Sequence, residues 1–490
     1  MKRISFARFT ISSLLLALFF VALATPAARR PRYGGTLTID LQGRATSLDP
    51  AQKQGTFADQ IAQERLLRLI ADRLVEIDQF GHPKPALAIS WQHDGKFTRW
   101  EFRLRPDIKF QDATLLTPQF VADSLHAIDP GWRVSATKDS MIVESDVPLP
   151  DLLYVLAETQ NSIVLRKPIG EIIGTGPFRL TAWEPGKRAV FTANDDYWSG
   201  RPFVDCIDVQ MGRTVRERMI DLDLGKADIA DVSPDRARID ASRGVRISAS
   251  DPAELLALVF VRSSAHAKDI RIRQALSLAI DRASLVDFVL QKEGEPAGAL
   301  LPQWSSGYAF LFSTAADAPA ARQLASQISP SPALRLGYDS ADPMERMIAE
   351  RIAVNAQAAG ISISARAITA ASAGAIVNRA ANHGANVPEY DARIMRLPIS
   401  SPAPGAAFED FLQTFAQLAD LDPSLVAPLN NPADPDELYS RERAVVDTYE
   451  IIPLVHVPEV VGLSARVRDW MPARWGAWRL ADVWLDGAAQ

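Results

Sequence analysis

The chain contains almost no cysteine. Cys206 is the one cysteine in 490 residues, which excludes an internal disulfide and a metal cage built from several thiolates. The 6 histidines are scattered, and none stands in the His-x-x-x-His or His-Glu-x-x-His spacing of zinc hydrolases. The formal net charge of -6 argues against the basic surface that nucleic-acid backbones require. Composition alone therefore disfavours redox, zinc-hydrolase and nucleic-acid functions.

Long apolar runs are also lacking, with one exception near the first residue. Lys2, Arg3 and Arg8 precede an apolar run over 11–23 that is too short to span a bilayer comfortably. A small-x-small pattern ends at Ala24, so residues 1–24 are predicted to be a cleaved signal peptide; an uncleaved anchor helix is the alternative. No cysteine stands beside this run, which excludes a lipid anchor there. We expect the mature protein in the periplasm.

Local motifs for catalysis are missing as well. The chain has no Walker loop and no Gly-x-Ser-x-Gly elbow. Gly174-Thr175-Gly176 does not match a dinucleotide loop, because Arg179 stands where a third glycine is needed and Pro177 removes an amide. Asp195-Asp196 are adjacent carboxylates, which a solvated turn explains best. We expect no enzymatic activity, no cofactor and no metal; a periplasmic hydrolase whose groups converge only in the fold is kept as an alternative.

The remaining composition is that of a globular protein, with 47% hydrophobic and 23% charged residues, and the length favours two or three domains. Apolar periodicities of both strand and helix type indicate an α/β fold. Predicted strands are 37–41, 100–104, 178–183, 189–193, 255–261, 334–338 and 361–365; predicted helices are 62–74, 118–127, 270–290 and 344–359. The Ala/Ser-rich stretches 315–332 and 369–386 are predicted to be loose surface segments.

Four groups of motifs follow one another along the chain. The first pairs Gly34-Gly35-Thr36-Leu37-Thr38-Ile39 with Ser47-Leu48-Asp49-Pro50-Ala51. The second joins Ala86-Leu87-Ala88-Ile89-Ser90-Trp91, Trp100-Glu101-Phe102-Arg103-Leu104-Arg105 and Asp107-Ile108-Lys109-Phe110-Gln111-Asp112. The third is Gly174-Thr175-Gly176-Pro177-Phe178 with Asn194-Asp195-Asp196-Tyr197-Trp198, and the fourth is Arg271-Ile272-Arg273-Gln274-Ala275-Leu276 and onward to Arg282. Together they resemble the extracellular solute-binding proteins of family 5, the peptide/nickel/opine-type receptors of ABC importers.

The resemblance implies an α/β, two-lobed periplasmic-binding-protein architecture (type II, three-domain) with a hinged cleft. It places a discontinuous first lobe at 34–56, 165–255 and 460–490, an extra domain at 57–164 and a further lobe at 256–459. It implies a monomer that captures a small solute, a peptide or a related compound, and delivers it to an ABC permease in the inner membrane. A repurposed receptor on the same fold, acting in signalling or protein interaction, is the alternative.

The candidate ligand site departs from the family pattern. Peptide-binding members carry, after a strand beginning like Tyr390-Asp391, an acidic segment that meets the ligand's amino terminus. Here Arg393 and Arg396 stand in that segment, and a guanidinium matches a carboxylate rather than an ammonium. We expect Arg396 either to receive an anionic group of the ligand or to pair with an acid such as Glu389 or Asp410. A peptide ligand is not assured.

Two further pairs of residues are candidates for ligand contact. The resemblance places Trp304 and Tyr308 near the cleft, where aromatic side chains suit a pocket wall, although packing within one lobe is the alternative. Arg44 and Ser47 stand at the mouth of the first predicted strand.

Overall fold

The structure, a computed structural model, describes residues 30–487 except 53, 79–80, 129–130, 168–170, 243, 370–389 and 473–477. The predicted signal peptide, the candidate partner Glu389 and nearly all of the predicted loose segment 369–386 lie outside the described residues. Within the described ranges, no helix combines the length and apolar composition that a membrane crossing requires.

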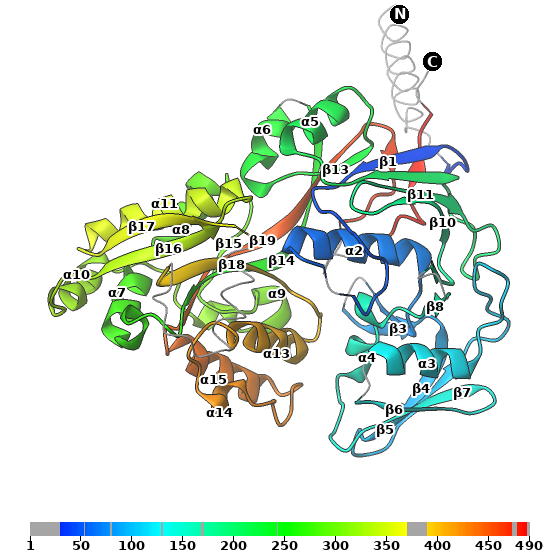
Figure 1. The fold of residues 1–490 in the computed structure, drawn as a ribbon, viewed down its shortest axis with the longest axis horizontal. Helices are drawn as coiled ribbons and strands as arrows, with labels where there is room; N and C mark the ends of the chain where they lie inside the picture. The colour runs from blue at the N-terminus through cyan, green and yellow to red at the C-terminus, as the bar shows by residue number, and fades with distance from the viewer. Residues whose placement is uncertain are drawn as a thin grey trace, which may run out of the picture.

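A large mixed sheet runs through the whole molecule (Figure 1). Among the described residues its strands follow the order β10-β11-β12-β1-β13-β19-β14-β18-β16-β17, with β15 beside β19. Their bounds are β1 (Thr36–Asp40), β10 (Phe178–Glu184), β11 (Arg188–Ala193), β12 (Cys206–Gln210), β13 (Ile229–Asp231), β14 (Arg246–Phe260), β15 (Glu295–Pro296), β16 (Ala333–Asp339), β17 (Ser362–Ile368), β18 (Ala392–Pro398) and β19 (Ile451–Leu463). β1 is parallel to β12 and β13, and β16 is parallel to β17 and β18.

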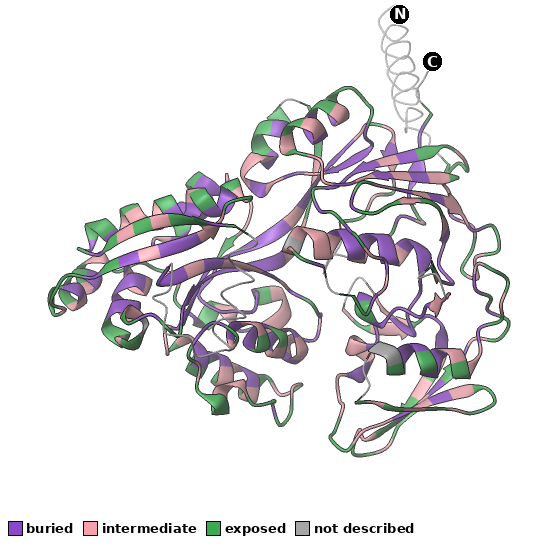
Figure 2. Cartoon of the chain, in the orientation of Figure 1, coloured by how far each residue is buried: buried purple, intermediate pink, exposed green. Residues whose placement is uncertain are grey.

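The two long strands β14 and β19 connect the two ends of this sheet. They pair antiparallel from Arg246 opposite Leu463 to Val259 opposite Ile451. The register shifts on both sides of Pro252, which lies opposite Pro458. Because proline has no amide to donate, the ladder is interrupted where the two strands pass from one end of the sheet to the other. Figure 2 shows that both strands are buried for most of their length.

The β16–β18 end of the sheet is covered on both faces. Leu256 and Leu258 face a cluster that includes Ile348 of α11, whereas Leu255 and Ala257 face a cluster on the other side with α13. The strand predicted at 255–261 is therefore confirmed, and it is buried on both faces. The helices at this end are α7 (Ile270–Ala279), α8 (Arg282–Ser284), α9 (Gln303–Ser306), α10 (Ala318–Ser326), α11 (Pro343–Ala358), α13 (Pro404–Phe415), α14 (Pro423–Val426) and α15 (Pro435–Val446).

The other end of the sheet packs against α2 (Phe57–Ile70), and a smaller α/β body lies beyond it (Figure 1). That body has a core of its own, built from residues between Leu74 and Ile163. It contains a sheet of order β4-β5-β7-β6, formed by β4 (Ala88–His93), β5 (Arg99–Leu104), β6 (Arg133–Ala136) and β7 (Ser140–Glu144), with α3 (Pro118–Ile128) and α4 (Leu152–Val155). Small paired strands are β2 (Val75–Ile77), β3 (Pro83–Pro85), β8 (Leu165–Arg166), β9 (Ile172–Ile173), β20 (Val467–Arg468) and β21 (Trp484–Leu485), and the helices α5 (Val215–Asp223) and α6 (Ala237–Ser242) flank β13 and β14.

The predicted division into lobes stays a prediction, but the packing of α2 bears on one boundary. Ala62, Leu66 and Ile70 of this helix belong to the core around Leu37 and Ile39 of β1. The separate core of the smaller body begins at Leu74. The packing thus groups α2 with β1, although the predicted extra domain of 57–164 includes it.

Two predictions about secondary structure are wrong. The helix predicted over 270–290 ends at Ala279, because Ile280 is extended and buried and Asp281 caps the next turn by accepting from the Ser284 amide. A π-helical stretch then covers Leu285–Val289. The stretch 315–332, predicted to be loose, contains α10, which Asp317 caps; its alanines are strong helix formers.

The motif Gly174-Thr175-Gly176 forms a turn that packs closely against α2. The Gly176 amide donates to the Ile70 carbonyl at 2.9 Å, so this turn lies directly against the end of α2. A Cβ atom at position 174 would lie 1.9 Å from the Ile70 oxygen. The glycine is required by the close approach of two backbones.

We therefore predict that Gly174→Ala lowers the free energy of unfolding by at least about 2 kcal/mol, because backbone rather than a flexible side chain blocks the new methyl group. Gly95→Ala is the matched control, since nothing lies within 4 Å of its added Cβ. Urea denaturation of both variants measures the difference. Equal stability of the two variants would contradict the packing role.

Candidate functional site

A large cavity of about 1680 Å³ lies where α2, the smaller body and the two ends of the large sheet meet. We call it the central cavity. Its lining comes from segments far apart in the chain: α2 and the turn before it, 212–218 and 231–234, the crossing strands near Glu254 and Glu459, the end of β18 with the residues that follow, and 478–482. The side chains that face it include many charged residues.

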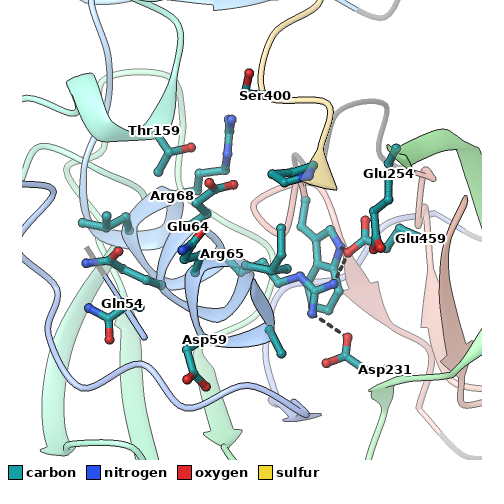
Figure 3. Close-up of a pocket in the computed structure, with 18 of the residues that line it drawn as sticks. Gln54, Asp59, Glu64, Arg65, Arg68, Thr159, Asp231, Glu254, Ser400 and Glu459 are labelled. Carbon is teal, nitrogen blue, oxygen red and sulfur yellow. Dashed lines mark hydrogen bonds and ion pairs between the residues drawn. The ribbon is translucent and has the colours of Figure 1, made fainter. Parts of the chain in front are cut away.

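Arg65 of α2 anchors one wall of the central cavity (Figure 3). Its guanidinium donates to Asp231 at 2.5 Å and to Glu459 of β19. The ring of Trp478 lies 3.9 Å from the guanidinium carbon, and the indole nitrogen donates to Glu459 at 3.1 Å. Arg65 therefore joins α2 to β13, to the crossing strand β19 and to the C-terminal segment.

Arg396 of β18 anchors the opposite wall. It donates to Glu254 of β14 at 2.9 and 2.5 Å and to Asp342 at 2.7 Å. Burial is the largest influence on Glu254 and raises its pKa, although the charge of Arg396 acts in the opposite direction. Removing one partner of such a pair destabilises the folded protein, since the other partner is left as a buried charge without compensation.

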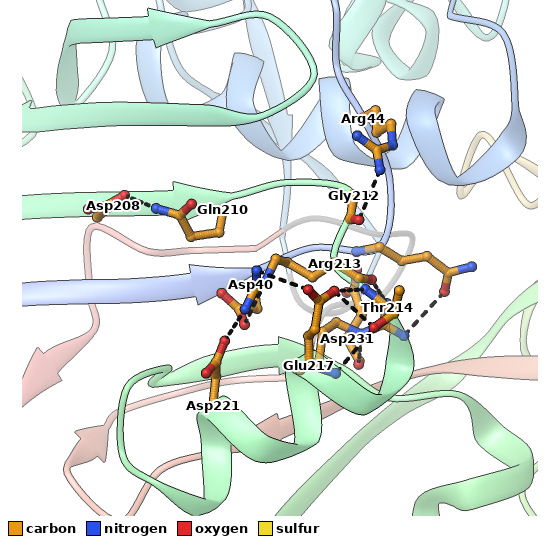
Figure 4. A network of polar contacts seen from close by, with 12 residues as sticks. Asp40, Arg44, Asp208, Gln210, Gly212, Arg213, Thr214, Glu217, Asp221 and Asp231 are labelled. Carbon is orange, nitrogen blue, oxygen red and sulfur yellow. Dashed lines mark hydrogen bonds and ion pairs between the residues drawn. The ribbon is translucent and has the colours of Figure 1, made fainter.

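Arg213 is held by a third network on the wall formed by β1 and α5 (Figure 4). It pairs with Asp221, with Glu217 at 3.4 Å and with the buried Asp40 at 3.7 Å. Burial and the nearby charge of Asp221 raise the pKa of Asp40 to about 7. Thr214 and Glu217 form a capping box that begins α5 at this point.

Carboxylates face one another where the smaller body approaches α13. Burial raises the pKa of Glu158 to about 8, and the negative charge of Asp410 adds to that shift. Burial likewise raises the pKa of Asp151 to about 6, with the charge of Glu409 as a further cause. Both shifts favour the protonated form in the folded protein.

The structure brings three of the predicted site residues to the central cavity: Arg44, Arg393 and Arg396 all line it. Arg44 donates to the carbonyls of Gly186 at 3.4 Å and Gly212 at 3.1 Å. An ion pair, the alternative expected for Arg396, is present with Glu254 and Asp342; the suggested partner Glu389 lies outside the described residues.

Trp304, Tyr308 and Ser47 lie elsewhere, and a ligand role for them stays a prediction that the geometry does not favour. Trp304 packs against a core cluster and donates to the Pro252 carbonyl at 2.8 Å. Tyr308 is buried and donates to Glu442 at 2.6 Å. The Ser47 hydroxyl accepts from the Asp49 amide at 3.0 Å, which makes it a turn residue.

Sequence reasoning missed the acids that hold the cavity together: Asp231, Glu254 and Glu459. A signal for two of them was present. Glu254 directly precedes the apolar run of β14, and Glu459 interrupts the apolar run of β19. A lone carboxylate in a run of buried residues needs a partner, so each position predicted a buried arginine somewhere in the fold.

Metal ligands are not assembled in the part of the chain that the structure describes, where no group of three His, Cys, Asp or Glu side chains is placed to hold an ion. The side chain of His82 is 75% exposed, and His93 stacks on Phe97.

The fold is that of a two-lobed periplasmic binding protein, as solved structures show. NikA from Brucella suis in complex with Fe(III)-EDTA matches with a TM-score of 0.80 at 18% identity, over 92% of this chain and 100% of that chain. The periplasmic binding protein DppA from Helicobacter pylori in complex with the peptide STSA matches with a TM-score of 0.77 at 16% identity, over 93% and 99% of the two chains.

The family model of bacterial extracellular solute-binding proteins, family 5, matches residues 82–417, and the chain belongs to this family. Its members are solute-binding proteins, so the protein is a solute-binding protein and not an enzyme. The probable D,D-dipeptide-binding periplasmic protein DdpA of Escherichia coli is 25% identical over 249 residues, which are 45% of this chain and 48% of DdpA. The match thus spans about half the length of that relative.

We predict that Arg396→Met lowers the free energy of unfolding by about 3–5 kcal/mol, because Glu254 and Asp342 are left facing each other without their shared cation. Arg393→Met is the control. Arg393 lines the same cavity, and its side chain donates a 3.4 Å hydrogen bond to the Ile394 carbonyl. Guanidinium denaturation compares the two. Equal losses would contradict the role of the ion pairs.

We also predict that stability falls as pH rises. A carboxyl whose folded pKa is raised favours folding at low pH, and that contribution is lost as pH climbs through the folded value, here about 6 for Asp151 and about 8 for Glu158. In Glu158→Gln the loss between pH 5 and 9 should shrink by on the order of 2 kcal/mol. Thermal denaturation across this range tests the change, and an unaltered slope would contradict it.

Proposed function

We propose that the protein is the substrate-binding component of an ABC importer in the periplasm, where it captures a small polar solute, a peptide or a related compound, in the central cavity. It then delivers the solute to a membrane permease as a monomer. The observation that carries this proposal is the central cavity itself, whose walls come from both ends of the large sheet and from α2.

The size and lining of the cavity support a charged organic solute. At about 1680 Å³ it exceeds the roughly 300–1,000 Å³ of ordinary small-molecule pockets. Such pockets are mostly apolar, whereas arginines and carboxylates of several segments line this one. Relatives are named for binding D,D-dipeptides, oligopeptides and nickel, which agrees with a solute of peptide size or with a chelate.

The crossing strands support closure around the solute. The ladder between β14 and β19 is interrupted at Pro252 and Pro458, so a change of angle there breaks few hydrogen bonds. A solute that contacts both walls binds the closed arrangement better than the open one and shifts the population toward it.

The test is mass spectrometry of the protein purified gently from the periplasm of its own organism. We expect the native spectrum to carry an added mass that the denaturing spectrum lacks, and the released molecule to be a peptide or another charged organic solute. A protein that carries nothing, and whose melting temperature does not change with peptides, sugars, opines or nickel chelates, would overturn the transport role in favour of a repurposed receptor.

A further inference from the structure

The arginines that line the central cavity differ in whether their charge is already compensated. Arg65, Arg213 and Arg396 are each paired with two or more carboxylates. Arg201 pairs with Asp195 and Asp205. Arg218 donates to the carbonyls of Asp231 and Arg213 and to the Gln42 amide oxygen. These side chains hold the walls in place and their charges are compensated, although the Nε atoms of Arg65 and Arg213 also lack an acceptor in the described structure.

Arg68 of α2 is different. In the described part of the structure its guanidinium has neither a hydrogen bond nor an ion pair, and its Nε atom is buried without an acceptor. Figure 3 shows the side chain extending from α2 between Thr159 and Ser400, which belong to opposite sides of the cavity. The guanidinium is therefore presented to the space that a solute would occupy.

Arg73 follows α2 and lines the same cavity. It is 5% exposed, and both its Nε and one Nη atom lack an acceptor in the described structure. Its nearest carboxylate oxygen belongs to Glu76 at 3.6 Å, and Glu76 also pairs with Lys84 at 2.9 Å. The charge of one carboxylate is thus shared between two cations.

The two guanidinium groups are close enough to disturb each other. Burial lowers the pKa of Arg68 to about 9, and the positive charge of Arg73 is the next largest cause, with a smaller effect from Arg479. Glu64, one turn before Arg68 on α2, offsets part of this charge, but burial raises its own pKa. Buried cations without acceptors are costly, and an anion placed between them removes that cost.

We propose that Arg68 and Arg73 form an anion subsite of the central cavity, which receives a carboxylate of the solute. The inference deepens the proposed function and rests on it. It moves the expected anion contact from Arg396, whose charge Glu254 and Asp342 already compensate, to the end of α2. The Nε–H of Arg68 and the Nε–H and Nη–H groups of Arg73 that lack acceptors are charge-assisted donors, which a carboxylate satisfies.

The test uses ligand-free protein, prepared by unfolding and refolding, in wild-type, Arg68→Gln, Arg68→Lys and Arg346→Gln forms. Arg346 is the matched control, because it is exposed on α11 and pairs with Glu350 away from the cavity lining. Three probes are used: a pool of short peptides from a casein digest, the same pool with all carboxyl groups methyl-esterified, and succinate against chloride at equal ionic strength. Calorimetry and thermal denaturation report binding.

We expect wild type and Arg346→Gln to bind the unmodified pool and to lose most of that binding after esterification. Arg68→Gln should bind the unmodified pool about ten- to hundredfold more weakly, and Arg68→Lys should recover part of the loss. Without ligand, Arg68→Gln should melt no lower than wild type, because the repulsion from Arg73 is removed. A clear loss of stability in this variant would mark Arg68 as structural and overturn the subsite.

The outcomes separate the two proposals. Equal binding of both peptide pools by wild type would overturn the anion subsite and leave the proposed function standing. Binding of succinate that depends on Arg68, without binding of either pool, would support the subsite and overturn peptides as the solute. Binding of no probe in a manner that depends on Arg68 would overturn the subsite, whatever the purified protein carries.

Discussion

Two buried carboxylates on the crossing strands constrain the rest of the structure. Glu254 of β14 and Glu459 of β19 stand beside the prolines at which the ladder is interrupted. Neither can be left alone inside the protein, so each is met by an arginine from another element: Glu254 by Arg396 of β18, and Glu459 by Arg65 of α2. The strands that connect the two lobes are thereby tied to a wall of each.

This arrangement divides the charged residues of the cavity into two kinds. The paired arginines are part of the scaffold, and their geometry is set by the acids that they meet. In the second kind, Arg68 has no ion pair in the described structure and Arg73 shares the charge of Glu76 with Lys84; both have buried nitrogen atoms without acceptors. The proposed anion subsite uses this second kind, because a ligand carboxylate gives an acceptor to donors that the empty cavity leaves unsatisfied.

Local patterns predicted much of the fold. Alternation at Leu37 and Ile39 predicted β1, and the stripe from Met344 to Ala359 predicted α11, whose end lies just before Gly360. The prediction of a helix to residue 290 was wrong because the Asp281 side chain accepts a hydrogen bond that starts a new turn. A hydrophobic stripe contains no information about such a cap. Ordered family signatures predicted the two-lobed fold, since each reports a turn or a core contact that the fold needs.

The candidate site was less predictable, because its contacts join distant parts of the chain. Arg396 meets Glu254 across 142 positions, and Arg65 meets Glu459 across 394. Arg396 was a candidate because an arginine replaced an expected acid, but the type of a residue does not say whether its charge is already compensated. The sequence does not distinguish Arg68 from the other polar residues of an amphipathic helix.

The structural relatives at 16–18% identity show the fold alone, so the chemistry of the proposed solute depends on the lining of the central cavity in this chain. In this chain the lining is charged on every wall, and most of the charge is neutralised within the protein. In the proposed subsite, selectivity then rests on Arg68 near the end of α2 and on Arg73 just after it, and α2 packs with β1 rather than with β18. A solute held there by its carboxylate must still reach across the cavity to favour closure, which sets a minimum length for it as well as a charge.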